Sequence, residues 1–302
     1  MAIKNIFRAC IISLAFIFLL NLYGCASSGN YDNNDNNDNN DNNDTTITVP
    51  TVPTASGILT ISVLKAGQAD AIVITTQNSC MVIDCGEKDD ADKVLHYLKE
   101  RNIKTIDYLV ITHFDKDHVG GAAKILSNVT ANIIYVPDYK GNTDEYKKYI
   151  NALEMNSMSQ TAITENVSFL LDDVLFEIYS PLKTSYRGDN DYSLVVLAKH
   201  GNLSFLFAGD AESERISELM EQLDGNYDYF KVPHHGRFDD MTSEFINFVN
   251  PSIAVITDSE KNPADDRTIE SLSALGCEVY CTKDGTVTAI SDGSEITVEL
   301  VP

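Results

Sequence analysis

The sequence has few basic side chains. Its 302 residues include 22 lysines and arginines against 45 aspartates and glutamates, which gives a formal net charge of −23. Such a chain repels phosphate backbones, so this balance argues against a protein that clamps nucleic acid through a basic surface alone. A phosphate substrate would need local positive charge, such as metal ions. The hydrophobic content of 43% is high enough for a substantial core, in one large or two small domains.

Long apolar runs are scarce too. One uncharged run of 16 positions follows Lys4 and Arg8 and ends before Cys25, which is typical of a secretory signal over residues 1–24. The segment LYGC that ends at Cys25 resembles the lipobox of bacterial lipoproteins. It predicts lipidation of Cys25 and an extracytoplasmic protein anchored to the cell membrane. The alternative is an uncleaved membrane helix, for which the run is marginally short.

Residues 32–44 contain no apolar side chain. They read DNNDNNDNNDNND, a three-residue repeat that cannot bury anything, and proline-punctuated chain follows it. We therefore predict a solvated, disordered tether over residues 25–57 and a folded domain over residues 58–302. Calcium binding by the repeat is the weaker alternative, because the repeat has no glycine turn and no glutamate to close a loop.

Cysteine is also sparse in the predicted domain, which holds Cys80, Cys85, Cys277 and Cys281. Their spacings do not fit a zinc knuckle. The last two are four positions apart in a predicted strand, hence about 13 Å apart and too distant to bridge each other. A bridge between the two pairs and ordinary buried thiols are both open.

Short apolar runs predict most of the secondary structure. Strands outnumber helices, yet helices recur between them, which predicts an α/β fold with two mixed sheets packed together and helices outside. This is an αββα four-layer sandwich made of two related halves. The predicted strands are 58–65, 70–76, 79–85, 106–111, 132–138, 167–171, 174–180, 192–198, 203–210, 227–236 (strand, then loop), 253–258, 278–282, 286–290 and 295–300. The predicted helices are 91–98, 122–126, 143–155, 211–223, 242–250 and 267–276.

Histidines are few, 6 in all, but four of them fall in two loops that each follow an apolar strand. Aspartates also stand at strand ends, where rigid scaffolds present ligands. Convergence of these ends would supply a dinuclear metal site built from imidazoles and carboxylates. The residues at these strand ends are His113, His118, His234, His235, Asp84 and Asp210.

Purely structural roles are the alternative for each residue taken alone. Asp115 or Asp117 would cap a helix, Asp210 would cap the helix that follows it, and the histidine pair of VPHHG would form a polar loop. Capping does not require histidines in both loops. The joint pattern therefore favours a metal site.

Six motifs, in order, resemble those of one family. THFDKDHVGG resembles the HxHxDH signature of the metallo-β-lactamase superfamily, in the THxDxDHxGG form found in the hydrolase domain of ComEC-type competence proteins. AGQADAIVI, VIDCG, NDYSLVVLA, FLFAGD and KVPHHG resemble further motifs of that domain, and the match extends over residues 58–290. The resemblance implies a metal-dependent hydrolase with two divalent ions, zinc or manganese.

The resemblance also implies individual roles. The metal ligands would be His113 and Asp115 for one ion, Asp117, His118 and His235 for the other, and Asp210 as a bridge. Asp117 and His234 would take part in the reaction, His234 as a hydrogen-bond donor or general acid. Asp84 would orient a ligand histidine.

The chain departs from the family where a third histidine is expected. The corresponding strand offers Asn190, Asp191 or Ser193, and we expect Asn190 and Ser193 beside the ligands. With fewer nitrogen ligands, the first ion would favour manganese or magnesium relatively more than zinc. The late segment NPADD keeps Asn262 but lacks the histidine of the family's segment, which leaves a role of this loop in substrate contact in doubt.

Two basic residues are candidates for substrate contact. Arg237 follows HHG, where the family often has serine, and would either lie beside an anionic substrate or pair with Asp239 or Asp240 on the surface. Lys65, near the glutamine of AGQAD, is the second candidate.

The predicted activity is hydrolysis of phosphoric esters. Two metals would lower the pKa of a shared water, give a metal-bound hydroxide and offset charge on the ester oxygens. We expect an exported phosphodiesterase or nuclease for extracellular nucleic acid, single-stranded DNA included, with no obligate protein partner. No multi-span segment accompanies the domain, so we do not expect a DNA uptake channel.

Three other functions fit the same residues. They are an esterase of phosphorylcholine or teichoic acid in the cell envelope, a hydrolase of lactams or thioesters, and an inactive surface-binding module. The negative field favours small or envelope-borne substrates over duplex DNA.

Overall fold

The computed structural model describes residues 50–302. The predicted signal over residues 1–24, Cys25 and most of the predicted tether lie outside the described residues. Within the described residues, every helix is too short or too polar to cross a membrane. The first strand, β1, begins at Leu59.

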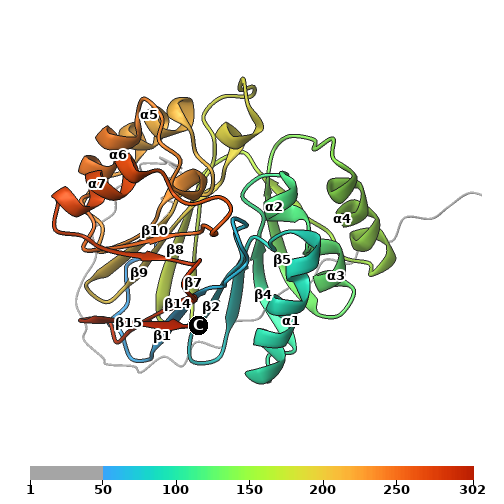
Figure 1. Ribbon diagram of the computed structural model, residues 1–302. Coiled ribbons are helices and arrows are strands. Elements are labelled where there is room, and N and C mark those ends of the chain that lie inside the picture. The colour runs from blue at the N-terminus through green and yellow to red at the C-terminus, as the bar shows by residue number, and fades with distance from the viewer. Residues whose placement is uncertain (1–49) are drawn as a thin grey trace, which may run out of the picture. The chain divides into compact units, whose positions relative to one another are not determined.

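Two mixed β-sheets form the middle of the folded part (Figure 1). The first sheet has the strand order β15-β14-β1-β2-β3-β4-β5-β6, and the second has the order β13-β12-β11-β10-β9-β8-β7. The strands of the first sheet are β1 (Leu59–Val63), β2 (Ile72–Thr75), β3 (Cys80–Ile83), β4 (Thr105–Val110), β5 (Thr130–Pro137), β6 (Thr161–Ile163), β14 (Thr286–Ser291) and β15 (Ile296–Val301). Those of the second sheet are β7 (Val167–Leu171), β8 (Val174–Tyr179), β9 (Val195–His200), β10 (Leu203–Phe207), β11 (Tyr229–Lys231), β12 (Ile253–Ile256) and β13 (Glu278–Cys281).

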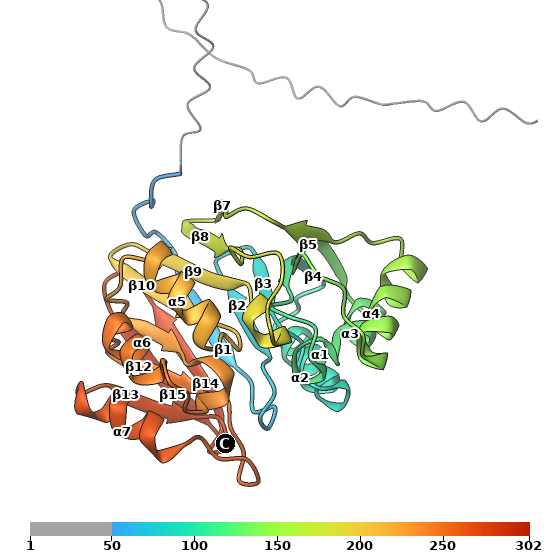
Figure 2. The same ribbon diagram turned by 90° about the horizontal axis from the view of Figure 1, so that it is seen from above.

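Helices cover the outer face of each sheet, which completes the predicted αββα sandwich (Figures 1 and 2). The first sheet carries α1 (Ala91–Glu100), α2 (Lys116–Val119), α3 (Ala122–Leu126) and α4 (Asp144–Met155). The second carries α5 (Ser213–Gln222), α6 (Thr242–Val249) and α7 (Asp266–Ala274). The described residues also form three single turns of 3-10 helix: η1 (Lys88–Asp90), η2 (Asp189–Tyr192) and η3 (Pro233–Gly236).

The core follows from the alternation of side chains along the strands. Leu59, Ile61 and Val63 of β1 point between the sheets, where they join a cluster that includes Phe176 of β8. Val73 of β2 points to the other face and joins the cluster beneath α1, α3 and α4. A third cluster lies between the second sheet and its helices. The protein therefore has three apolar layers between its four layers of structure.

Three details differ from expectation or resolve an alternative. β6 was missed because its three residues, TAI, carry no apolar pattern. The strand predicted from residue 192 begins at Val195, after the turn η2. The four cysteines of the described residues are free, and Cys80, Cys85 and Cys277 are buried, so the thiol alternative is correct.

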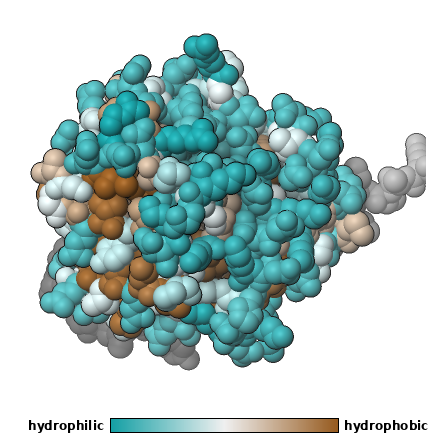
Figure 3. Space-filling view, viewed as in Figure 1, coloured by the Kyte–Doolittle hydropathy of each residue, from teal (hydrophilic) through white to brown (hydrophobic). Residues whose placement is uncertain are grey.

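The start of the folded part is fixed at one edge of the sandwich. Thr60 pairs with Thr75, and Thr75 pairs with Cys80, whereas the opposite ends of these strands lead to Asp84. Asp173, in the turn between β7 and β8, accepts the backbone N–H of Gly57 at 2.8 Å. The face seen in Figure 3 is mostly hydrophilic, with apolar residues gathered at the side that carries α7 and the edge strand β15.

Candidate metal centre

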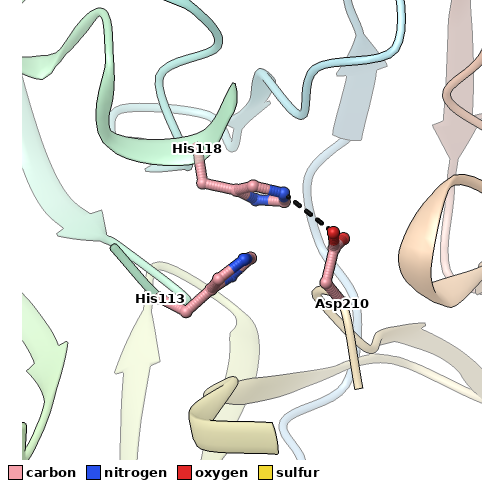
Figure 4. A group of neighbouring side chains, drawn as sticks. All are labelled: His113, His118 and Asp210. Atoms are coloured by element: carbon pink, nitrogen blue, oxygen red, sulfur yellow. Dashed lines mark ion pairs between the residues drawn. The ribbon is translucent and has the colours of Figure 1, made fainter. Parts of the chain in front are cut away.

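The histidine loops meet at the edge of the sandwich opposite Gly57. β3 and β4 are parallel, so Asp84 and His113, which follow them, stand at the same edge of the first sheet. β10 and β11 are parallel in the second sheet, so Asp210 and His235 stand together there. Figure 4 shows that the side chains of His113, His118 and Asp210 point toward one another.

Three imidazoles and two carboxylates form the centre of this cluster. Asp210 Oδ2 lies 3.2 Å from His118 Nε2 and 3.1 Å from His235 Nε2. His235 Nε2 also lies 3.5 Å from Asp117 Oδ2. Ligand atoms of His113, His118 and Asp210 lie within 4.8 Å of one another, and so do those of Asp117, His118 and His235. The two groups overlap at His118.

The donor atoms of this cluster fit a metal ion. Nε2 of His113, His118 and His235 and Oδ1 of Asp210 are buried and have no hydrogen-bond partner in the part of the chain that is described. A buried polar atom without a partner costs about 1–3 kcal/mol, so such atoms are rare unless they have another function. Imidazole nitrogen and carboxylate oxygen are the ligand atoms that divalent transition metals take in proteins.

The other ring nitrogen of each histidine is held in place. The partners of Nδ1 are Thr112 Oγ1 for His113 at 3.1 Å, Asp84 Oδ2 for His118 at 2.7 Å and Thr257 Oγ1 for His235 at 3.0 Å. Thr112 donates its single hydroxyl proton to Asp84, and Thr257 donates its own to Asp70, so both hydroxyls accept from the histidines. Each Nδ1 therefore carries a proton, and each Nε2 is the atom that can bind a metal.

Burial and charge divide the pKa values of these histidines. Burial lowers the pKa of His113 to about 3. Burial also acts to lower the pKa of His235, but the carboxylates of Asp210, Asp117 and Asp70 outweigh it and raise that pKa to about 10. The same competition raises the pKa of His118 well above its usual range, through Asp210 and Asp84. A metal ion at Nε2 of His118 or His235 would therefore displace a proton, whereas Nε2 of His113 is already free of one.

The VPHHG loop turns through an uncommon backbone conformation. His234 and His235 have φ of 46° and 55°, in the left-handed region that costs energy for residues other than glycine. This turn sends His235 into the buried cluster and leaves His234 nearer the surface, with 18% of its side chain exposed. His234 Nδ1 lies 3.1 Å from Glu212 Oε1, and Asn190 Nδ2 donates to that same oxygen at 3.0 Å. His234 therefore lies outside the ligand cluster and faces solvent.

The residues expected in place of a third histidine have other partners. Asp191 accepts the backbone N–H groups of Glu212 and Arg215 and so supports the start of α5. Ser193 Oγ accepts the backbone N–H of Asp210 at 3.1 Å. Asn190 lies beside His234, with Nδ2 3.3 Å from its Nε2. Asn190 and Ser193 thus lie next to proposed site residues, and Asp191 is turned away.

Asp115 and Asp210 do not act as helix caps through their side chains. Asp115 stands at the N-cap of α2, but its side chain accepts no capping hydrogen bond. It is 42% exposed, and its Oδ2 lies 4.0 Å from His113 Nε2. The N-cap of α5 is Glu212, so the interpretation of Asp210 as a cap is wrong.

The two basic candidates have different surroundings. Lys65 contacts Thr286 through its backbone N–H and Lys93 through its carbonyl oxygen. Arg237 is exposed, forms no ion pair within residues 50–302, and its charge helps to lower the pKa of His234, chiefly lowered by burial. Arg237 is therefore an exposed cation close to His234.

Sequence reasoning missed one buried group behind the ligands. Asp70 and Lys231 are fully buried, and Lys231 Nζ lies 2.7 Å from Asp70 Oδ2. Asp70 belongs to AGQADAIVI and Lys231 opens KVPHHG, so both stand in motifs that were recognised. Their pairing was not visible, because it joins positions from different sheets.

Comparisons with known proteins give matches by sequence and by fold. The family model of the metallo-beta-lactamase superfamily matches residues 64–256. ComE operon protein 3 of Bacillus subtilis (strain 168) is 27% identical over 223 residues, which cover 67% of this chain and 28% of that protein. Recombination protein 2 of Haemophilus influenzae is 26% identical over 208 residues, which cover 67% of this chain and 24% of that protein. The chain thus spans about a quarter of the length of these relatives.

A solved structure shares the fold. The metallo-beta-lactamase fold protein YhfI from Bacillus subtilis superposes with a TM-score of 0.52 at 10% sequence identity. The superposition covers 81% of this chain and 100% of that one.

Proposed function

Because the chain belongs to the metallo-beta-lactamase superfamily, we propose that it is a metal-dependent hydrolase of phosphoric esters, with nucleic acid as its substrate. The observation that carries this proposal is the buried convergence of three Nε2 atoms and Oδ1 of Asp210, all without hydrogen-bond partners in residues 50–302. The name of Recombination protein 2 of Haemophilus influenzae supports nucleic acid as the substrate class. The match covers only about a quarter of each relative's length. An action of this chain on nucleic acid is therefore a proposal.

Two divalent ions would be held unequally. Asp117, His118, His235 and Asp210 would hold one ion, and they offer two nitrogens and two carboxylates. His113 would hold the other with Asp210 and the half-exposed Asp115, which offers a single nitrogen. Because this second set has one nitrogen and an exposed carboxylate, we expect it to bind its ion more weakly than the first set. Carboxylate-rich sites also favour manganese or magnesium relative to zinc.

The chain's own residues would divide the remaining work. When bound, divalent ions supply Lewis acidity, which lowers the pKa of water and offsets charge on phosphate oxygens. His234 is partly exposed beside the ligands and is oriented by Glu212 through Nδ1, so the neutral ring presents the lone pair of Nε2, which can accept a hydrogen bond or a proton there. Asp117 has 22% of its side chain exposed, so besides holding an ion it can accept a proton from solvent or substrate. Arg237 supplies positive charge beside an anionic substrate.

A substrate panel tests this function. The full chain, loaded with zinc or manganese, is assayed with bis-p-nitrophenyl phosphate, single-stranded DNA, a phosphorylcholine ester and nitrocefin. We expect turnover of the first two and a loss of at least about 100-fold in the Asp210→Asn variant, which removes the bridging carboxylate. The matched control is Asp292→Asn, which changes an exposed aspartate in the turn between β14 and β15.

Each outcome of the panel has a definite meaning. Turnover of the phosphorylcholine ester alone would support an envelope esterase, and turnover of nitrocefin alone a carbonyl hydrolase. Equal turnover by the wild type and Asp210→Asn would mean a contaminant and would support an inactive binding module.

We further propose that the protein is extracytoplasmic and anchored through lipidated Cys25. The apolar run and LYGC motif of residues 1–25 support this location. Cys25→Ser should release the protein from the membrane fraction of the expressing bacterium. Unchanged retention of this variant would instead support an uncleaved helix.

A further inference from the structure

The proposed ligands are divided between the two halves of the sandwich. His113, Asp117 and His118 follow strands of the first sheet, whereas Asp210 and His235 follow strands of the second. The relative position of the two halves therefore sets the distances between ligands. We propose that the buried Asp70–Lys231 ion pair is a positioning device that joins the two halves behind the ligands, orients His235 and so sets the affinity for metal. This inference rests on the proposed metal centre.

The pair links opposite sheets. Asp70 lies just before β2 of the first sheet, and Lys231 is the last residue of β11 in the second. Asp70 is 1% exposed and Lys231 is 0% exposed, with 2.7 Å between Oδ2 and Nζ. Lys231 Nζ also donates to the carbonyl oxygen of Val232 at 3.0 Å, which fixes the direction of the ammonium group.

Asp70 contacts both ligand-bearing loops. Its second carboxylate oxygen, Oδ1, accepts the hydroxyl of Thr257 at 2.6 Å, and Thr257 Oγ1 lies 3.0 Å from His235 Nδ1. Its backbone N–H donates to the carbonyl oxygen of Asp117 at 3.1 Å. One residue thus joins the loop of Asp117 to the ring of His235.

Stability alone does not account for such a pair. Removing two charges from water is costly, and apolar residues of similar volume often stabilise a fold as well or better. The other two histidines are oriented by Asp84 and Thr112 of their own half. Only His235, among the three, has a carboxylate from the opposite half behind its Nδ1, with Asp70 Oδ1 at 3.5 Å. The placement of the Asp70–Lys231 pair behind Nδ1 of His235 is explained by a geometric role, the orientation of this ring.

Metal titration of the full chain tests the inference. Zinc affinity is measured by competition with a chromophoric chelator, and cobalt(II) absorption reports the ligand geometry directly. Three variants interrupt the linkage at different points: Thr257→Val, Lys231→Met, and the double variant Asp70→Asn/Lys231→Met. The control is Lys199→Met, which removes an equally short ion pair, 2.7 Å from Glu177, between β8 and β9.

We expect Thr257→Val and the double variant to fold, because neither leaves a buried charge unpaired. Both should weaken the tighter zinc site about 10-fold to 100-fold and change the cobalt spectrum, as loss of a group that orients a ligand does. Lys199→Met should bind both metals like the wild type. Wild-type zinc affinity and an unchanged cobalt spectrum in the double variant would overturn the proposal, even if Lys231→Met alone fails to fold.

The test separates this inference from the proposed function. Metal affinity is measured without substrate, so a wild type that binds zinc but hydrolyses no phosphoric ester would overturn the function and leave the positioning role intact. If the wild type hydrolyses phosphoric esters but Thr257→Val and the double variant keep the wild-type metal affinity, the proposed function stands and the positioning role is overturned.

Discussion

The metal-free protein should be most stable near pH 6.5. His113 is neutral in the folded state, with a pKa lowered from 6.5 to about 3, mainly by burial. Between these pH values the unfolded chain binds a proton that the folded chain excludes, so stability falls as the pH decreases below 6.5. His235 has the opposite shift, because carboxylates outweigh burial and raise its pKa from 6.5 to about 10. The contribution of His235 to the free energy of unfolding is fully present below pH 6.5 and is lost as the pH rises toward 10.

The size of the alkaline loss follows from the same shift. One pH unit corresponds to about 1.4 kcal/mol for a single proton, so the change from pH 6.5 to 8.5 removes at most about 3 kcal/mol through His235. Measurements should stop at pH 8.5. Above pH 9 a second loss begins, because burial raises the pKa of the Cys80 thiol from 9.0 to about 12.

The assay is urea unfolding of the full chain at pH 5.0, 6.5 and 8.5, with a chelator and then with saturating zinc. In the chelator, stability should be highest at pH 6.5. With zinc, the alkaline loss should disappear, because the metal replaces the protons on Nε2 of both His235 and His118, whose pKa values are raised. Asp210→Asn should also flatten the alkaline side, since it removes the largest charge that raises this pKa. A metal-free wild type that gains stability between pH 6.5 and 8.5 would refute the reasoning.

Three further predictions concern single side chains. Asp84→Asn should weaken zinc binding about 10-fold to 100-fold by competition titration, because the carboxylate holds Nδ1 of His118 at 2.7 Å; unchanged affinity would remove Asp84 from the site. Gly121→Ala should shift the ligand loop and reduce the metal content of the purified protein, since a Cβ there would lie 2.2 Å from a backbone carbonyl oxygen. Gly57→Ala, with its nearest contact at 3.5 Å, is the control. Phe176→Ala should cost about 3–5 kcal/mol in urea unfolding while zinc affinity is kept, because this ring is buried between the sheets far along β8 from the ligands.

The sequence predicted the elements whose patterns are local. Leu59, Ile61 and Val63 alternate with polar or oppositely directed residues, so β1 could be recognised without its partners. β6 could not, because three residues are too few to show a period. The same reasoning applies to the site, where His113 and His235 were found as polar residues directly after apolar strands.

Contacts between distant positions could not be predicted in this way. Asn190, Asp191 and Ser193 were all offered in place of the third histidine, with Asn190 and Ser193 expected beside the ligands, and only the backbone through η2 shows that Asp191 turns toward α5. Asp70 and Lys231 are 161 positions apart in the sequence and belong to different sheets, so neither residue's neighbours indicate the other. Their pairing depends on how the two sheets pack, which a single sequence does not reveal.

The hydrogen bond from Gly57 to Asp173 also fixes how the domain can be approached. It holds the first residues of the folded part at the edge opposite the histidine loops. If the folded domain is attached to another structure through the residues before Gly57, its histidine loops lie at the edge farthest from the attachment.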